Sequence, residues 1–418
     1  MNWTMFPMPE VVDINPRRPQ SIKLIDDDPI TFVPMMAVSE KNAVIEAAEV
    51  RPYGEVKKGF TYFENKDVLF AKITPCMENG KSALAFGLKN NIGFGSTEFH
   101  VLRANQNVLD PRFLHYFIRR QTFRKEAKLR MRGAAGQQRV PQDFFEDVLI
   151  PLPCISEQRR IVEILDQADT LRKKRAEADA KAARILPALF YKIIGDQVTN
   201  PHAYPKVSVG ELVERIQRRN PTDSPDNTFK YVDISGVDGE SGKIVEFKEL
   251  AGREAPSRAR QVIRTNDILI STVRPYLRAT ALVPAELDNE ICSTGFCVLR
   301  ARNNKGFGYL YTLSRLRWFT ESLNSMARGA SYPAVTDNDV LGFRVSYPTD
   351  NSKIKQFDDV ILRLIELQDS RRNSSNMLDN LFATILHQAF TGDLTHKWRE
   401  VHMEELLAEM EAQAKVLG

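Results

Sequence analysis

Asp67-Val-Leu-Phe-Ala-Lys-Ile-Thr-Pro75 returns about 200 positions later as Asp267-Ile-Leu-Ile-Ser-Thr-Val-Arg-Pro275, with the apolar positions and the final proline kept. Two further pairs follow in the same order. Ser96-Thr-Glu-Phe-His-Val-Leu-Arg103 matches Ser293-Thr-Gly-Phe-Cys-Val-Leu-Arg300, and Arg132-Gly-Ala-Ala-Gly-Gln-Gln-Arg-Val140 matches Arg328-Gly-Ala-Ser-Tyr-Pro-Ala-Val335. A repeat of such long period constrains the architecture before any single motif is considered. The chain is therefore predicted to contain two similar units.

Each unit is predicted to be a sheet-rich α+β domain followed by a long helix. Short apolar runs bounded by Gly, Pro, Asn and Asp, such as 67–73 and 267–273, are typical of strands. Helical patterns follow at 110–131 and 307–327. The predicted parts are a first domain at 1–152, a first long helix at 153–200, a second domain at 201–348, a second long helix at 349–395 and a helical tail at 396–418.

The two long helical regions carry apolar residues at alternating steps of three and four, which is a heptad seam. A helix from 157 to 194 would be about 55 Å long at about 1.5 Å per residue, longer than such a domain is wide. We therefore predict two antiparallel helices that separate the domains in a pseudo-twofold arrangement. The alternative is that each helix packs only on its own domain. The predicted pairing residues are Ile161, Ile164, Leu171, Ile185, Leu189, Ile354, Phe357, Ile361, Leu364, Leu378, Phe382 and Ile385.

Composition excludes several classes of protein. The chain has 418 residues, of which 43% are hydrophobic, enough for several domains with cores of their own. A net charge of +4 does not indicate nucleic-acid binding by itself, so a DNA-binding surface requires local clustering of cations. No window reaches the roughly 18 apolar residues of a membrane span. The four cysteines show no paired CxxC spacing and the start has no signal pattern, so we expect a cytoplasmic protein with reduced thiols.

The duplicated order of these segments resembles the specificity subunits of type I restriction-modification systems. Its strongest carriers are Pro151-Leu-Pro-Cys-Ile-Ser-Glu-Gln-Arg-Arg-Ile161, similar to the start of that family's first conserved helix, and Ala389-Phe-Thr-Gly-Asp-Leu394, similar to the end of its second. The second helix begins at Asp350-Asn-Ser-Lys-Ile354 without the Glu-Gln-Arg of the first copy.

This resemblance implies a non-catalytic subunit with two target recognition domains that read a bipartite DNA site with a fixed spacer. It also implies two modification subunits that methylate adenine with S-adenosylmethionine. The further partners implied are restriction subunits that translocate and cut DNA with ATP and Mg. No cofactor or metal is expected on this chain itself.

The DNA-reading residues are expected at equivalent places in both units. Cations position a protein on phosphates, whereas Arg, Lys, Asn, Gln, Ser and Thr read base edges. The densest basic run has seven cations between Arg119 and Arg132 and one acid, Glu126; its alternative interpretation is a solvated helix face. The candidates are Lys72, Thr74, Arg124, Lys128, Arg132, Gln137, Gln138 and Arg139 in the first unit, and Arg258, Arg260, Thr272, Arg274, Tyr276, Arg278, Arg328, Ser331 and Tyr332 in the second.

Two other functions fit parts of the sequence. Asp226, Glu246 and Lys248 loosely match a metal-dependent nuclease pattern, but the first unit has Ala48 where the lysine would stand. The chain could also be a two-domain scaffold that binds protein. The six histidines have no ligand spacing, so no zinc site is predicted.

Overall fold

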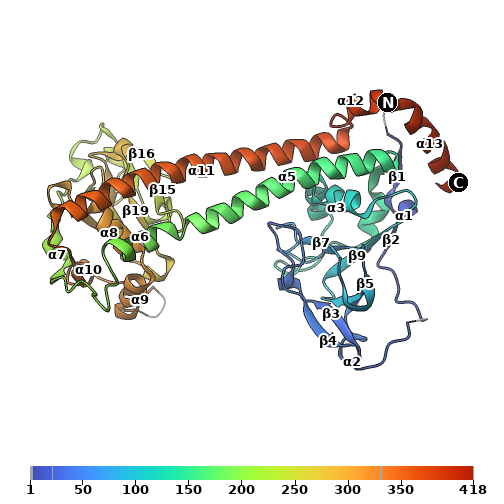
Figure 1. The fold of residues 1–418 in the computed structure, drawn as a ribbon. Helices are drawn as coiled ribbons and strands as arrows, with labels where there is room; N and C mark the ends of the chain where they lie inside the picture. The colour runs from blue at the N-terminus through green and yellow to red at the C-terminus, as the bar shows by residue number, and fades with distance from the viewer. Residues whose placement is uncertain (1–2, 21, 330–331, 418) are drawn as a thin grey trace. The chain divides into compact units, whose positions relative to one another are not determined.

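The computed structural model describes residues 3–20, 22–329 and 332–417. It forms two compact units: unit 1 combines 1–176 with 374–418, and unit 2 spans 177–373. Each unit therefore contains one sheet-rich domain and a part of both long helices (Figure 1). In the described part of the chain, no helix is both long enough and apolar enough to cross a membrane.

Unit 1 contains two four-stranded sheets, in the orders β2-β9-β6-β7 and β4-β3-β8-β5. Strand β3 runs parallel to β8, and the other neighbours are antiparallel. A separate antiparallel pair, β1 with β10, joins the beginning of the domain to its end. The strands are β1 (Met5–Pro7), β2 (Val12–Ile14), β3 (Pro29–Val33), β4 (Glu49–Pro52), β5 (Thr61–Glu64), β6 (Val68–Ala71), β7 (Ser82–Leu84), β8 (Ile92–Gly95), β9 (Phe99–Ala104) and β10 (Leu149–Pro151).

Several helices accompany the sheets of unit 1. Helix α3 starts where the local sequence directs it, because Asp110 accepts a hydrogen bond from the Arg112 amide at 2.8 Å and Pro111 occupies the first helical position. The helices are α1 (Met8–Val11), α2 (Tyr53–Val56), α3 (Pro111–Arg119), α4 (Gln121–Leu129), α12 (His396–Val401) and α13 (Met403–Leu417), together with parts of α5 (Ile155–Ala182) and α11 (Asn351–Thr391).

Unit 2 repeats this topology strand for strand. Its sheets have the orders β12-β21-β18-β19 and β16-β13-β20-β17, again with one parallel pair, β13 and β20. A hairpin, β14 with β15, is an addition to the repeat. The strands are β11 (Lys206–Ser208), β12 (Val213–Glu214), β13 (Thr228–Val232), β14 (Val237–Asp238), β15 (Lys243–Ile244), β16 (Lys248–Ala251), β17 (Ala259–Val262), β18 (Ile268–Ser271), β19 (Thr280–Leu282), β20 (Ile291–Ser293), β21 (Phe296–Ala301) and β22 (Arg344–Ser346). The helices are α6 (Ile185–Ile193), α7 (Val209–Leu212), α8 (Phe307–Arg315), α9 (Arg317–Met326) and α10 (Asp337–Leu341).

The predicted fold class is thus confirmed: two similar sheet-rich α+β domains, accompanied by long helices. In each unit, an ion pair to a buried carboxylate joins two of the quoted segments. Arg103 Nε and Nη2 donate to the two carboxylate oxygens of Asp67 at 2.8 and 2.7 Å, and Arg300 does the same to Asp267 at 3.0 and 2.7 Å. Each carboxylate begins one repeated segment and each arginine ends the next, so the duplication preserves both halves of a paired contact.

The long helices run antiparallel within each unit. In unit 1 the beginning of α5 lies along the end of α11 (Figure 1), and Arg172 Nε donates to Asp379 Oδ1 at 2.7 Å. In unit 2 the pairing is between the end of α5 and the middle of α11, where Arg371 Nε donates to Asp179 Oδ1 at 3.0 Å. Each unit therefore contains an ion pair between the two helices.

Both helices also pack on the domains, at positions that include several of the predicted pairing residues. In unit 1, Ile161 and Phe382 are buried in one core with the domain, and Ile385 packs against that core. In unit 2, Ile354, Phe357 and Ile361 share a core with Phe190 of α6, and Leu189 lies against it. The Phe190 and Phe357 rings are 5.8 Å apart. Ile164, Leu364 and Leu378 are partly buried.

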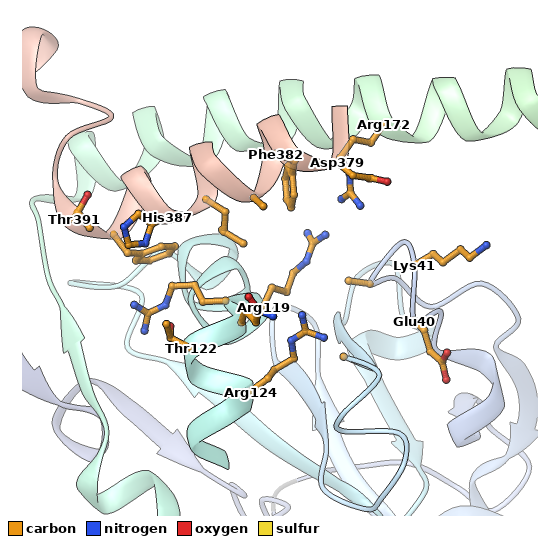
Figure 2. A pocket seen from close by; sticks show the side chains of 17 residues that line it. Glu40, Lys41, Arg119, Thr122, Arg124, Arg172, Asp379, Phe382, His387 and Thr391 are labelled. Atoms are coloured by element: carbon orange, nitrogen blue, oxygen red, sulfur yellow. The ribbon is translucent and has the colours of Figure 1, made fainter. Parts of the chain in front are cut away.

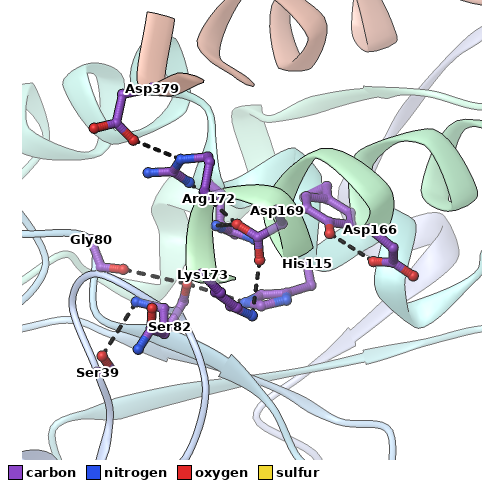
Figure 3. Close-up of polar contacts among 12 residues, drawn as sticks. Ser39, Gly80, Ser82, His115, Asp166, Asp169, Arg172, Lys173 and Asp379 are labelled. Carbon is purple, nitrogen blue, oxygen red and sulfur yellow. Dashed lines mark hydrogen bonds and ion pairs between the residues drawn. The ribbon is translucent and has the colours of Figure 1, made fainter. Parts of the chain in front are cut away.

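The buried stripe of α5 differs from the predicted seam. Leu171 is 56% exposed and, in α6, Ile185 is 44% exposed, so neither belongs to a buried seam. Asp169 is 5% exposed instead, because it pairs with Arg119, Arg172 and Lys173 at 3.2, 3.3 and 2.9 Å (Figure 3). A pattern of apolar residues cannot reveal a helix face that is buried through an ion-pair network.

The first long helix is also shorter than the predicted 153–200. It is interrupted after Ala182, and α6 ends at Ile193. Pro187 is the third residue of α6, and a proline ring there would clash with the carbonyl of Ala183 in a continuous helix. Gly195, with φ of 96°, follows the end of α6.

Candidate nucleic-acid interface

Backbone pairing gathers the candidates of unit 1 that lie far apart in sequence. The loop at 132–140 is closed by two hydrogen bonds, in which the amides of Arg132 and Arg139 each donate to the other's carbonyl at 2.9 Å. The Thr74 amide then donates to the Gln138 carbonyl at 2.9 Å, and the Val140 amide to the Lys72 carbonyl at 2.9 Å. Residues 72–74 therefore lie beside 132–140, and the two segments form what we call loop pair 1.

Unit 2 builds the same arrangement, loop pair 2, from 272–274 and 328–335. The amides of Arg328 and Ala334 each donate to the other's carbonyl at 2.9 Å. The Arg274 amide donates to the Pro333 carbonyl at 2.7 Å, and the Val335 amide to the Thr272 carbonyl at 2.9 Å. Ser331 lies outside the described residues. The same backbone scaffold thus carries different side chains in the two units.

Two cations of loop pair 1, Arg139 and Arg132, pair with acids. Arg139 donates to both carboxylate oxygens of Glu98 at 2.9 Å, and this contact lowers the pKa of Glu98. Arg132 pairs with Asp143 at 3.0 Å, with the two side chains 67% and 49% exposed. Exposed single ion pairs contribute little stability, so Arg132 can exchange Asp143 for a phosphate at small cost. Gln137 and Gln138 are exposed, while Lys72 and Thr74 are half-buried.

Most of the basic run around α3 and α4 is paired with acids. Arg119 pairs with Asp169, Lys128 with Glu78 at 2.7 Å and Arg130 with Asp147 at 2.9 Å. The described residues give no ion pair to Arg120, Arg124 or Lys125. The run is therefore not a uniform cationic face. The acids were missed in the sequence because they come from other segments, which spacing along the chain does not connect.

Loop pair 2 presents an aromatic and a cation together. Arg274 has a left-handed backbone, with φ of 50°, and its guanidinium lies 4.5 Å from the centre of the Tyr332 ring. Tyr332 is 67% exposed and Tyr276 is 51% exposed. Arg328 is also exposed and lies 3.8 Å from Asp339. Arg278, again left-handed, is exposed as well.

Two predicted contacts in unit 2, Thr272 and Arg260, make hydrogen bonds within the domain. Thr272 is 8% exposed, and its hydroxyl donates to the Gly295 carbonyl at 2.9 Å, so this side chain does not face a ligand. Arg260 donates to the carbonyls of Pro256 and Ala259 at 3.2 and 2.8 Å, which ties its guanidinium to its own loop. Arg258 stays exposed, and its carbonyl accepts from the Thr294 amide at 2.9 Å, next to Gly295.

Comparison with known proteins identifies the domain of unit 1. Residues 1–178 match the family model for the type I restriction modification DNA specificity domain. These residues, fewer than half of the chain, are similar to that domain. The resemblance to type I specificity subunits is thereby confirmed, and loop pair 1 lies within this specificity domain.

Relatives and solved structures agree. The EcoAI type I restriction enzyme specificity subunit of Escherichia coli is 40% identical over 161 residues, which are 38% of this chain and 27% of that protein. The match thus spans about a quarter of the relative. A structure of a type I R-M system superposes with a TM-score of 0.56 at 20% identity and covers 94% of this chain and 98% of that one. The type I restriction-modification S subunit of M. genitalium gives 0.52 at 14% identity, covering 93% and 96%. The likeness of the whole chain to these structures is one of fold.

Proposed function

We propose that this chain is the DNA-reading specificity subunit of a type I restriction-modification complex and catalyses no reaction itself. Loop pair 1 would read one half of a bipartite site and loop pair 2 the other, with the helices setting an unread spacer between them. The observation that carries the proposal is the duplicated loop scaffold with divergent side chains, Gln137, Gln138 and Arg139 against Tyr332 and Arg274, on a chain whose first domain is a specificity domain.

The partners follow from the same family. Modification subunits would bring S-adenosylmethionine and methylate adenine at the recognised site. Restriction subunits would bring ATP and Mg and would translocate and cut the DNA. The family match favours this function over a nuclease on the chain itself, and Asp226 of the nuclease pattern is 89% exposed and paired with Arg253 at 2.8 Å.

Duplex DNA binding measured against salt tests the proposal. Binding through several phosphates should weaken log-linearly as salt rises. Arg132→Ala and Arg274→Ala should each weaken binding, with the salt slope reduced by about one per lost phosphate contact. Lys355→Ala, at an exposed cation of α11, is the control and should bind as the unaltered protein does.

Affinity that does not change with salt, or two loop variants with unaltered affinity and slope, would contradict DNA reading by these loops. A protein-binding scaffold predicts that outcome.

A further inference from the structure

Unit 1 contains a cavity of about 560 Å³ between the α3–α4 bend, the loop at 40–43 and the end of α11 (Figure 2). Its lining is cationic: five lysine and arginine side chains, from Lys41, Arg119, Arg120, Arg124 and Arg172, stand against two carboxylates. Figure 2 shows the guanidinium groups of Arg119 and Arg124 in the space between α11 and the loop that carries Glu40 and Lys41.

Two of these arginines, Arg120 and Arg124, form no ion pair with any residue that the structure describes. Arg119 pairs with Asp169 at 3.2 Å and Arg172 with Asp379 at 2.7 Å, but the described residues offer no ion pair to Arg120 or Arg124. Arg120 lies 3.8 Å over the Phe117 ring, and its Nε donates to the Phe117 carbonyl at 3.1 Å. Burial lowers the pKa of Arg120 to about 10, and the charge of Glu126 opposes this shift only in part.

Arg124 has fewer hydrogen-bond partners than its donors could use. Its Nε is buried without any hydrogen-bond acceptor, and its Nη1 has one long contact, 3.4 Å, with the Glu78 carbonyl. Burial, and then repulsion by Arg119, lowers the pKa of Arg124. Arg124 is half-buried, and a partly buried cation without an ion-pair partner carries a desolvation cost. Such a group in a cavity is therefore expected to meet an anion that binds there.

The backbone adds to the attraction for an anion. Arg120 is the residue before α4, and no side chain caps the nine-residue helix there. Gln121 and Thr122, the first residues of α4, line the cavity. The free amides and the dipole at a helix start favour a negative charge, which the two guanidiniums reinforce.

Unit 2 shows that the fold does not need these arginines. Its helices α8 and α9 meet in the same bend, with φ and ψ of −65° and 138° at Leu316 against −59° and 140° at Arg120. Leu316 and Thr320 stand at the positions of Arg120 and Arg124, and both are buried. The Thr320 hydroxyl donates to the Arg317 carbonyl at 3.0 Å, so it needs no further partner. A leucine and a threonine therefore suffice for the structure.

We propose that Arg120, Arg124 and the start of α4 form a binding site for a phosphate group. A guanidinium fork matches the oxygens of a phosphate, and two forks above a helix start can hold its double charge. A phosphate of a DNA backbone and one of a free phosphate-bearing molecule present the same chemistry to this site. The proposal does not depend on DNA reading by the loop pairs, because its probe is inorganic phosphate.

Titration of the full chain with inorganic phosphate, followed by calorimetry and by thermal melting, tests the site against chloride at matched ionic strength. Phosphate should bind saturably and raise Tm. The double variant Arg120→Leu, Arg124→Thr copies unit 2 and should bind phosphate at least about tenfold more weakly. Lys125→Ala removes an exposed cation of the same helix and should keep the affinity.

No saturable binding to the unaltered chain would overturn the proposal, and so would equal affinity in the double variant. Absence of saturable binding is measured on the unaltered chain and so does not depend on a variant that folds. If the double variant does not fold, Arg124→Gln alone is the milder substitution and should also weaken phosphate binding. Competition by phosphate against duplex DNA distinguishes the sources. If phosphate displaces DNA and the double variant has a shallower salt slope, the site holds a DNA phosphate; if phosphate binds without affecting DNA, it holds a free one. Both results support the site.

Discussion

At the scale of single residues, Glu157 and Gln158 act inside the molecule. Glu157 accepts from Arg399 Nε at 2.8 Å, from the Thr395 hydroxyl at 2.6 Å and from Trp3 Nε1 at 3.1 Å. The Gln158 side chain accepts from the Asp110 amide and donates to the Val108 and Pro153 carbonyls. These residues carried the sequence resemblance at the start of α5, and they fix that helix to the domain and to the tail.

In unit 2 another residue anchors the long helix to the domain. Asp358 of α11 accepts from the amides of Gly306 and Gly308 at 2.7 and 2.8 Å, at the beginning of α8. Gln158 does this at the beginning of α3. The absence of Glu-Gln-Arg from the second helix therefore reflects a different way of anchoring α11 to its domain.

Two buried histidines make the stability of unit 1 dependent on pH. Burial lowers the pKa of His100 to about 4 and that of His115 to about 3, against an ordinary value of about 6.5. Below pH of about 6.5 the unfolded chain takes up protons that the folded unit does not, so unit 1 loses stability as pH falls toward about 4. Unit 2 has Cys297 and Tyr311 at these positions.

We expect His115→Tyr, which copies unit 2, to lose less stability between pH 7 and pH 5 than the unaltered chain. The difference in lost free energy of unfolding between the two proteins is at most about 1.4 kcal/mol for each pH unit below the unfolded pKa. Urea unfolding at the two pH values measures it, with His202→Asn, at an exposed histidine, as the control. An equal loss in His115→Tyr and the unaltered chain would contradict this role of His115.

At the scale of elements, the tail is part of unit 1. Helix α12 supplies Arg399, which is 6% exposed and paired with Glu157 at 2.8 Å. Helix α13 contacts the start of α5: Cys154 Sγ, just before that helix, donates to the Leu406 carbonyl, and the Ser156 hydroxyl donates to Glu409. Helices α12 and α13 therefore pack on the beginning of α5, and Arg399 of α12 also lies over the Trp3 ring.

Removal of one partner of this buried pair should destabilise unit 1. Arg399→Met leaves Glu157 charged and unpaired, at a cost of about 3–5 kcal/mol. The double variant Arg399→Met, Glu157→Gln should recover part of that loss, and Lys397→Met, at an exposed cation of α12, should change little. Urea unfolding of the four proteins gives the comparison. A loss below about 1 kcal/mol in Arg399→Met would place the pair among the weak surface pairs.

The helical pair should set the length of the unread spacer. Insertion of one heptad after Arg175 in α5, with a matching heptad after Ser374 in α11, keeps the seam in phase. It lengthens the pair by about 10 Å at about 1.5 Å per residue, which is about three base pairs at the pitch of B-DNA. Methylation mapping of the variant with its modification partner should reveal the longer spacer. Retention of the original spacer would mean that the helices do not set it.

Sequence reasoning succeeded where short-range patterns determine structure. The repeated strands followed from apolar runs between turn residues, and the duplication predicted the shared topology. It failed where a partner comes from a distant segment: Asp169 is buried through Arg119, and the hydroxyl of Thr272 is held by Gly295. The interruption of the helix before Pro187 could have been predicted from the sequence, because a proline at that position is incompatible with a continuous helix. The grouping of 72–74 with 132–140 required the fold.

At the scale of the whole molecule, the account rests on duplication. Two domains share one topology and one loop scaffold, yet differ at the residues that face outward, Gln137 and Gln138 in one and Tyr332 in the other. Divergence on a constant scaffold is what two different half-sites require, since side chains at base edges specify sequence and backbone contacts position the protein. Each domain should therefore contribute its own half of the recognised sequence.

Mapping of methylated bases in the DNA of a strain that expresses this chain with its modification partner tests this claim most directly. The account predicts modified adenines within one split motif, two short specific sequences separated by a spacer of constant length. Modification of a single continuous motif, or no modification that depends on this chain, would contradict it.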